Sequence, residues 1–509
     1  ASARSAASAT GASVPTEVPR RRRASRPLAA TLLALLPVMG LADAPGDAGL
    51  DAMFARAARS GAMLRLMLQT FPKGADLHRH GEGALYAEDM LEWAAEKQGC
   101  LRGEHGRYAL ADCTDPGQPQ LAGLALRDQR LYNDAIDAMS MGRHGPPVGD
   151  PLVSGHEQFF ATFSRFSFGV RGERARLIAA NRELAALDHI HYLELMSGPR
   201  IDRDVRALLQ EEPWNEDDME GRLARMKPFL DAAVPAARAA TDEDEKEVAR
   251  LNGCDAGGQL PAACQVTVRY LGGMSRLSRP EQVFTGMALG FAVAAADPRY
   301  VGINIFSPED GHVSLRDYSL HMRMFAFFRK HYPSVRLTLH AGELSLGLVP
   351  PRDLTFHIRE AVEIAGARRI GHGVDIAYER DAAGLLRRMA EQGVAVEINL
   401  TSNDVILGVT GADHPLPLYL AAGVPVVLSS DDPGVARADL TQEYVRAVTE
   451  HGLSYTTLRQ ISRNSLTYSF LEGESLWQAD GRTRVAVCEG PLPGPSPACR
   501  AFLDANTKA

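Results

Sequence analysis

The sequence has no excess of positive charge. Its 509 residues contain 55 Lys and Arg against 63 Asp and Glu, which gives a formal net charge of -8 at pH 7. This balance provides no basic field that would attract a nucleic acid, so we expect no nucleic-acid partner. With 45% hydrophobic and 23% charged residues, the composition is that of an ordinary globular protein. The length allows either two to four domains or one large barrel with additions.

Several catalytic motifs are also absent. The chain has no phosphate-binding P-loop, no G-x-S-x-G and no dinucleotide-binding G-x-G-x-x-G. His156 and Glu157 begin an H-E-x-x-H zinc pattern, but Phe160 stands where the second histidine would be. No two cysteines form a C-x-x-C pair, so the zinc signature of the cytidine deaminases is missing. These five classes are therefore excluded.

Cysteine is scarce, and its spacing is regular. The six cysteines form three couples 10 to 13 residues apart, each in a loop-like stretch rich in Gly, Pro and Asp: Cys100 and Cys113, Cys254 and Cys264, Cys488 and Cys499. Three local disulfides in an oxidising compartment are the simplest interpretation. Unpaired thiols in a cytosolic protein are the alternative.

The first residues predict an export signal rather than part of the fold. Residues 20–23 are four arginines, residues 27–41 form an apolar run, and residues 42–44 match a small-x-small cleavage site. We therefore expect an N-terminal extension with a signal peptide over residues 1–44, the signal itself at about 20–44, and a secreted or periplasmic protein. A retained membrane anchor is the alternative, although the run is short and contains Pro37. We expect no stable membrane span after cleavage.

Beyond residue 44 we expect a single hydrolase domain, residues 45–509, in which strands alternate with helices. Its core covers about residues 70–475, with insertions at about 100–150 and 200–265. The eight expected strands lie near residues 73–80, 189–195, 266–271, 300–306, 335–340, 368–372, 394–399 and 424–430. This alternation implies right-handed βαβ units and a parallel sheet. Eight such units fit a closed (β/α)8 TIM barrel with its site at the C-terminal ends of the strands, and a doubly wound open sheet is the alternative.

Residue types that bind metals end several of these strands. Candidate ligands end strands one, five, six and eight: His78 and His80, His340, His372, and Asp431 with Asp432. Each alone could be a core histidine or a helix-capping aspartate. In a barrel, however, these ends meet at one mouth, and their nitrogens and carboxylate around an open position suit one catalytic Zn²⁺ per chain. Glu343, three residues after His340, can face the metal without binding it, and a histidine outside the ligand set could hold a hydroxide.

The motifs that carry these residues occur in a known order. They are H-x-H at 78–80, H-A-G-E at 340–343, G-H-G at 371–373 and S-x-D-D-P at 429–433. This order resembles the adenosine deaminase family of the amidohydrolase superfamily, and especially the secreted, growth-factor-related adenosine deaminases and their bacterial relatives. The stretches 401–403 (Thr-Ser-Asn) and 463–466 (Arg-Asn-Ser-Leu) support the resemblance, which covers about residues 70–475.

The resemblance implies a zinc-dependent hydrolytic deamination of adenosine or 2'-deoxyadenosine to inosine or 2'-deoxyinosine and ammonia. It implies four zinc ligands: His78, His80, His340 and Asp431. Glu343 would share a proton with purine N1, and His372 would orient the zinc hydroxide for attack on C6. Asp432 would contact N7, and Glu82 stands where the family usually has an acidic residue near the ribose.

Two departures from the family pattern affect substrate contacts and leave the ligands intact. The family usually offers a glycine amide to purine N3 after the fourth strand, whereas this chain has Ser307, Pro308 and Glu309. Because proline has no N–H, the backbone of Ser307 or Glu309 would make that contact. Gly81 and Glu82 replace the usual Leu-Asp. Deamination is therefore a firmer expectation than adenosine as the substrate.

Other functions stay open at this point. Another aminopurine (a modified adenosine, adenine or AMP) is the alternative substrate, and AMP is less favoured because no arginine cluster is evident at the mouth. Outside deamination, the chain could be another amidohydrolase or a catalytically weak, secreted binding or signalling module. The expected partner is a small-molecule purine nucleoside, and pairing into a homodimer is left open.

Overall fold

The computed structural model describes residues 47–509, apart from 105–106, 143–153, 201–211, 479 and 491–493. The chain divides into two compact units, residues 1–48 and 49–509, and the second unit holds every described strand. The expected signal peptide at residues 20–44 lies outside the described residues. Within the described part of the chain, no helix has both the length and the apolar character needed to cross a membrane.

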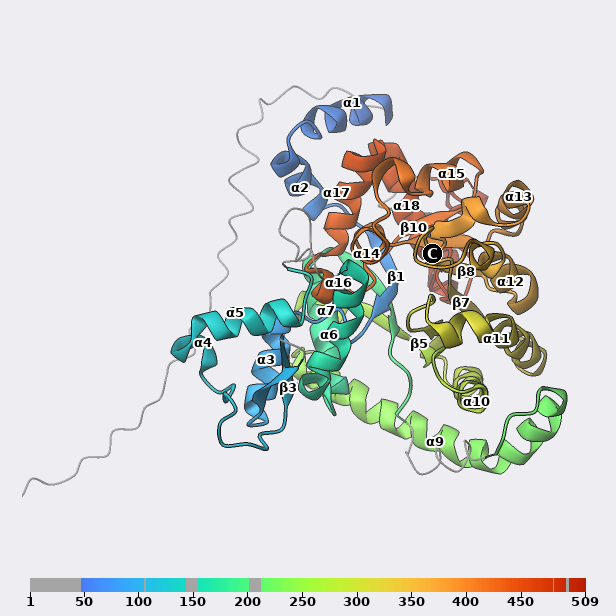
Figure 1. The fold of residues 1–509 in the computed structure, drawn as a ribbon. Helices are drawn as coiled ribbons and strands as arrows, with labels where there is room; N and C mark the ends of the chain where they lie inside the picture. The colour runs from blue at the N-terminus through green and yellow to red at the C-terminus, as the bar shows by residue number, and fades with distance from the viewer. Residues whose placement is uncertain (1–46, 105–106, 143–153, 201–211, 479, 491–493) are drawn as a thin grey trace, which may run out of the picture. The chain divides into compact units, whose positions relative to one another are not determined.

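Eight parallel strands form a barrel within the second unit (Figure 1). Neighbouring strands follow the chain order: β1 (Gly74–His80), β4 (Ile190–Met196), β5 (Thr267–Ser275), β6 (Tyr300–Phe306), β7 (Arg336–Ala341), β8 (Arg369–His372), β9 (Ala395–Ile398) and β10 (Val426–Leu428). The barrel closes where the Asp431 N–H donates to the His78 carbonyl and the His80 N–H donates to the Asp431 carbonyl, each at 2.9 Å. The expected (β/α)8 barrel is confirmed, and the open sheet is excluded.

The strands are buried on both faces, and their sequences show why. β9 is Ala-Val-Glu-Ile and β10 is Val-Val-Leu, and every residue in both is buried. Short runs rich in β-branched residues favour extended backbone, and parallel strands covered on both faces are nearly continuous in apolar residues. The exceptions, such as Arg369 in β8 and Glu397 in β9, are fully buried charges that support the site described below.

Helices connect the strands and cover the outside of the barrel, as α10 to α13 do in Figure 1. The first three described helices are α1 (Asp47–Ala57), α2 (Gly61–Gln69) and α3 (Ala87–Glu96). The described helices beyond residue 111 are α4 (Leu124–Arg127), α5 (Gln129–Ala138), α6 (Gly155–Val170), α7 (Arg174–Leu187), α9 (Met219–Leu251), α10 (Pro280–Ala296), α11 (His312–His331), α12 (His357–Glu360), α13 (Ala382–Gln392), α14 (Leu400–Leu407), α15 (Leu416–Ala421), α16 (Pro433–Ala436), α17 (Leu440–His451), α18 (Tyr455–Thr467) and α19 (Pro497–Ala505). Local chemistry sets their ends: Asp439 accepts from the Gln442 N–H where α17 begins, and Gly452 has φ 65° where it ends.

The two expected insertions have regular structure of their own. The first contains an antiparallel hairpin, β2 (Cys100–Glu104) and β3 (Arg107–Ala111), followed by α4 and α5, although the sequence shows little periodicity there. In the second, α9 extends over 33 residues and contains Pro228 and Pro235. A short 3-10 turn, Glu216–Asp218, precedes α9, and residues 201–211 lie outside the described residues.

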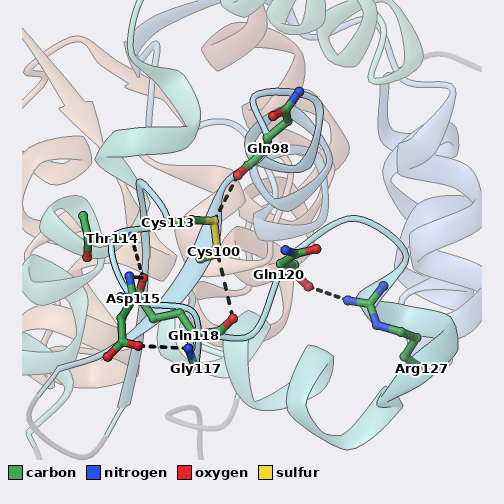
Figure 2. The surroundings of a disulfide bond; sticks show 9 residues. All are labelled: Gln98, Cys100, Cys113, Thr114, Asp115, Gly117, Gln118, Gln120 and Arg127. Atoms are coloured by element: carbon green, nitrogen blue, oxygen red, sulfur yellow. Dashed lines mark hydrogen bonds between the residues drawn. A yellow bond between two sulfur atoms is a disulfide. The ribbon is translucent and has the colours of Figure 1, made fainter.

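All six cysteines pair as the spacing predicts. The structure contains three local disulfides: Cys100–Cys113, Cys254–Cys264 and Cys488–Cys499. Figure 2 shows how a short loop follows the first of them. The Gln118 side-chain oxygen accepts from the Thr114 N–H at 2.9 Å, and Asp115 accepts from the Gly117 N–H at 2.9 Å. The disulfide therefore closes residues 100–113 into a loop, and the polar side chains of Asp115 and Gln118 fix the turn that follows it.

Candidate active site

A cavity of about 870 Å³ opens at the C-terminal ends of the barrel strands. It contains most of the residues that the sequence singles out: His80, Glu82, Ser307, His340, Glu343, Asp431 and Asp432. The lining also includes four aromatic rings, those of Phe159, Phe160, Phe163 and Phe306. Charged groups together with aromatic rings suit a small ligand that is flat and polar along its edge.

Four of the candidate ligands converge to one point. One side-chain atom each from His78, His80, His340 and Asp431 lies within 4.8 Å of the other three. Nε2 of His78 and Nε2 of His80 are each 3.3 Å from Oδ1 of Asp431. Three imidazoles and one carboxylate at this spacing form a donor set that suits zinc.

Buried partners fix two of these imidazoles in the orientation that a metal site needs. Nδ1 of His78 is 2.7 Å from Oε2 of Glu397, and Nδ1 of His340 is 2.9 Å from Oδ1 of Asn304. In each case Nδ1 carries the proton, so Nε2 keeps its lone pair. Burial alone would raise the pKa of Glu397, but Arg369 and His78 hold it at about 2, so this carboxylate stays ionised.

Two of the four donor atoms have no hydrogen-bond partner among the described residues. Nε2 of His78 and Oδ1 of Asp431 are buried and have no hydrogen-bond partner in the structure. A buried polar atom without a partner is costly and calls for an explanation. Coordination of a divalent ion supplies one, so the residues present fit a metal.

Glu343 lies beside this group without belonging to it. It is 7% exposed and stands in the turn after β7. Its Oε1 is 3.7 Å from Nδ1 of His372. Burial, reinforced by the negative charges of Asp431 and Glu309, raises the pKa of the Glu343 carboxyl well above its usual value. A carboxyl in this state can hold a proton near neutral pH.

A chain of hydrogen bonds determines which nitrogen of His372 carries a proton. The Leu416 N–H donates to Nδ1 of His414 at 3.1 Å, so the His414 proton is on Nε2, which lies 3.0 Å from Oδ1 of Asn403. The Asn403 amide must then present its NH2 to Nδ1 of His372, at 2.9 Å. His372 therefore accepts at Nδ1 and carries its proton on Nε2, which is 3.9 Å from Oδ2 of Asp431.

Three predicted site residues have backbone conformations that L-residues rarely adopt. Ser307, His372 and Asp431 have φ of 82°, 68° and 60°. Such conformations cost of order 1–3 kcal/mol each and gather at functional sites. All three lie just at or beyond a strand end, where the backbone turns its side chains towards the cavity.

Asp432 has its position because residue 83 is glycine. A Cβ at Gly83 would stand 1.6 Å from Oδ1 of Asp432, so only glycine leaves room for the carboxyl. Burial, with the neighbouring Asp431 charge, raises the pKa of Asp432 to about 8. The glycine at position 83, just after the H-x-H motif, is therefore a space requirement.

The structure does not bring Glu309 to the cavity wall, although Ser307 and Pro308 lie there. The Glu309 side chain is fully buried and accepts from the Gly342 N–H at 3.1 Å and the Glu343 N–H at 2.9 Å. Burial would raise its pKa, but Arg276 and His357 lower it to about 2. Glu309 therefore holds the turn that carries Glu343.

Sequence analysis missed the residues that support the site. Asn304 and Glu397 could have been suspected, because each is a polar residue inside an otherwise apolar strand. His414 gave no such signal. The arginines of the outer cavity were also missed: Arg171, Arg174 and Arg200 all line it. Two of them are neutralised, since Arg174 and Arg200 both pair with Asp244.

The protein is a (β/α)8 barrel, and a cluster of His and Asp side chains suited to bind a metal ion lies at its mouth. A family model described as adenosine deaminase matches residues 226–478. Over these residues, about half of its length, the chain is similar to the adenosine deaminase family. The matched range contains His340, His372 and Asp431 but not His78 or His80, which only the fold brings to them.

Two curated relatives show the same likeness. Adenosine deaminase from Escherichia coli (strain SMS-3-5 / SECEC) is 36% identical over 155 residues, which are 29% of this chain and 43% of that protein. The enzyme from Escherichia coli O1:K1 / APEC is 37% identical over 157 residues, again 29% and 43% of the two chains. The chain thus spans less than half the length of these relatives.

Solved structures share the fold at low sequence identity. Arabidopsis N6-mAMP deaminase MAPDA has a TM-score of 0.51 and 19% identity, covering 80% of this chain and 96% of that one. Arabidopsis ADAL complexed with GMP has a TM-score of 0.51 and 18% identity, with coverage of 80% and 94%. At these identities the likeness concerns the fold alone.

Proposed function

We propose that the chain is a metal-dependent hydrolytic deaminase that converts adenosine or 2'-deoxyadenosine to inosine or 2'-deoxyinosine and ammonia. One observation carries the proposal. The four-residue donor set, the protonated Glu343 carboxyl and the oriented His372 ring form one buried cluster, and His80, His340, Glu343 and Asp431 of that cluster line the cavity. The family supplies the reaction type, and the geometry supplies the groups that this reaction needs.

The proposed ligands of one Zn²⁺ are His78, His80, His340 and Asp431. Zinc is favoured because three imidazole nitrogens and one carboxylate match its preferred donors. When bound, zinc would lower the pKa of a water molecule to about 7 and so provide a nucleophile near neutral pH. The chain itself keeps the donors ready: Glu397 and Asn304 hold the Nδ1 protons of His78 and His340.

Glu343 and His372 would position and donate the protons that the reaction needs. A protonated Glu343 would donate to purine N1 and make C6 electrophilic. His372 presents an N–H from Nε2, so it would hold the attacking oxygen as a donor and would not take its proton. Its pKa is lowered to about 3, chiefly by burial, which keeps the ring neutral. These roles follow from which atoms carry protons.

The remaining contacts select the substrate. Asp432 would donate to purine N7 from its protonated carboxyl, which burial favours. Glu82, on the cavity wall, would accept from a ribose hydroxyl. The backbone of Ser307 would face N3. The Glu309 side chain is committed to the Glu343 turn, so we assign it a positioning role in place of a substrate contact.

A nucleotide such as AMP is the second candidate substrate, because arginine lines the outer cavity. Arg174 and Arg200 are paired with Asp244, but within the described residues Arg171 has no carboxylate within 4.0 Å. Comparison of kcat/KM for adenosine and AMP decides between the two. A tenfold preference for AMP that Arg171→Ala abolishes would favour the nucleotide.

Secretion of the protein and its assembly into a homodimer are further proposals. We propose secretion or a periplasmic location, which three disulfides support because such bonds persist in oxidising compartments. The homodimer stays an untested prediction.

The test of the catalytic assignment is Glu343→Gln. The variant keeps the shape and the backbone bonds to Glu309 but has no proton to share, so kcat should fall at least 1,000-fold on the scale of about 10²–10⁴ known for general acid–base catalysis. Zinc content should stay at one per chain. Substantial remaining turnover would refute the proton role.

A further inference from the structure

A second cavity, of about 780 Å³, lies at the opposite end of the barrel. Arg336 and Arg368 line it where β7 and β8 begin, whereas His340 and His372 reach the active site near the ends of the same strands. Four residues of strand separate Arg336 from His340, which is roughly 13 Å. The two cavities are therefore separate, and neither proposed catalytic residue nor proposed ligand lines this one.

This second cavity is strongly basic. Four cations line it: Arg329, Arg336, Arg368 and Lys508. Among the residues that the structure describes, none of the four has a carboxylate oxygen within 4.0 Å. The single acidic residue in its lining, Glu363, is already paired with Arg359 at 3.1 Å and Arg388 at 2.7 Å. The cavity thus carries about four uncompensated positive charges.

Arg336 is half-buried, whereas Arg329 and Arg368 are exposed. Nη1 of Arg336 donates to the Phe470 carbonyl at 2.9 Å and to the Leu471 carbonyl at 3.3 Å, which leaves Nε and Nη2 without a hydrogen bond to a described residue. The Arg329 guanidinium lies over Gly366: a Cβ at that glycine would stand 1.1 Å from Nη1. Lys508 is half-buried, and burial together with Arg336, Arg369 and Arg368 lowers its pKa to about 8. Like charges so close together repel, and an anion between them would relieve that cost.

We propose that this cavity binds a small molecule that carries phosphate groups and at least two negative charges, such as a polyphosphate. Planar guanidinium groups bind phosphate oxygens in pairs, and lysine adds a point charge. The volume lies within the range of small-molecule sites and is too large for a single monatomic ion. The Tyr468 hydroxyl in the same lining adds a hydrogen-bond partner, whereas the hydroxyls of Thr467 and Ser469 already contact Ser475 and the Leu466 carbonyl.

Isothermal titration calorimetry of the full chain with inorganic tripolyphosphate tests the proposal. Inorganic phosphate, pyrophosphate and sulfate serve as the comparison, because they lack a purine and cannot be mistaken for active-site ligands. We expect saturable one-site binding that tightens from phosphate to pyrophosphate to tripolyphosphate. Sulfate, with the charge of a single group, should bind at least tenfold more weakly than tripolyphosphate.

The double variant Arg368→Ala/Lys508→Ala locates the site. Neither side chain makes a hydrogen bond to another residue that the structure describes, so the fold should survive the change. Tripolyphosphate binding should weaken at least tenfold, while Lys330→Ala, an exposed lysine next to Arg329 that does not line the cavity, should bind like the parent. Absence of binding to the parent, or equal binding by the double variant, would overturn the proposal. Ammonia release by the same preparations reports separately on the active site, so loss of one property is distinguishable from loss of the other.

Discussion

The orientation of His372 gives the sharpest prediction about catalysis. Asn403 accepts from Nε2–H of His414 and donates to Nδ1 of His372, which forces the His372 proton onto Nε2. Asn403→Asp keeps the size and the bond from His414, but it replaces the donor with an acceptor. The carboxylate then favours the opposite tautomer, with the proton on Nδ1 and no N–H facing the cavity.

The expected loss follows from the strength of that new bond. A hydrogen bond to a charged acceptor contributes about 1.5–3 kcal/mol, so the productive tautomer should become about 10- to 150-fold rarer. We expect kcat for adenosine to fall by that factor, with KM within about threefold of the parent and zinc still bound. A kcat within threefold of the parent would refute the tautomer argument.

The pH dependence separates a tautomer effect from structural damage. A neighbouring carboxylate raises the pKa of a histidine, and doubly protonated His372 again carries a proton on Nε2. The deficit of the variant relative to the parent should therefore shrink towards pH 6 and be largest above pH 8. His451→Gln is the control, because the His451 ring packs against His414 at 5.6 Å and takes no part in the chain of hydrogen bonds.

Three further predictions concern space, charge and covalent links. Gly83→Ala would drive a Cβ to within 1.6 Å of Oδ1 of Asp432, so kcat/KM should fall at least tenfold with zinc retained, while Gly61→Ala, which meets nothing within 4 Å, should not change it. Burial raises the pKa of the Glu443 carboxyl to about 7. Between about pH 4.5 and 7 the folded state therefore binds more protons than the unfolded state. The free energy of unfolding should then fall by about 3 kcal/mol as the pH rises through that window. Because other buried carboxyls also have raised pKa values, urea titrations at pH 5 and pH 8 should show a difference about 3 kcal/mol smaller in Glu443→Gln than in the parent, and equal differences would contradict this. Reduction of the three disulfides opens three loops, each of which contributes about 3 kcal/mol to the free energy of unfolding in the chain-entropy account. The Tm should therefore drop by several degrees in reductant, and an unchanged Tm would contradict this prediction.

Much of the barrel and of its metal-binding cluster follows from local sequence. The strands are short apolar runs, and His340, His372 and Asp431 each sit where such a run stops. Because parallel strands in a barrel share one C-terminal mouth, position along the chain is enough to bring these residues together.

The supporting residues could not be placed in the same way. His414 lies in a loop, and its role depends on a ring position that only the packed structure sets. Glu309 was expected to offer its backbone to the substrate, but its side chain satisfies two N–H groups of the Glu343 turn. The basic cavity at the far end of the barrel likewise brings together Arg336 and Lys508, which are far apart in sequence. No local sequence pattern predicts this cavity.

The most direct test of the central claim is ammonia release from adenosine and 2'-deoxyadenosine by the purified chain before chelation, after chelation and after return of Zn²⁺. The account predicts release that chelation abolishes and that one equivalent of zinc per chain restores. If the zinc-loaded chain releases no ammonia from either nucleoside, nor from AMP or adenine, or if the metal-free chain keeps its full rate, the proposed reaction is wrong.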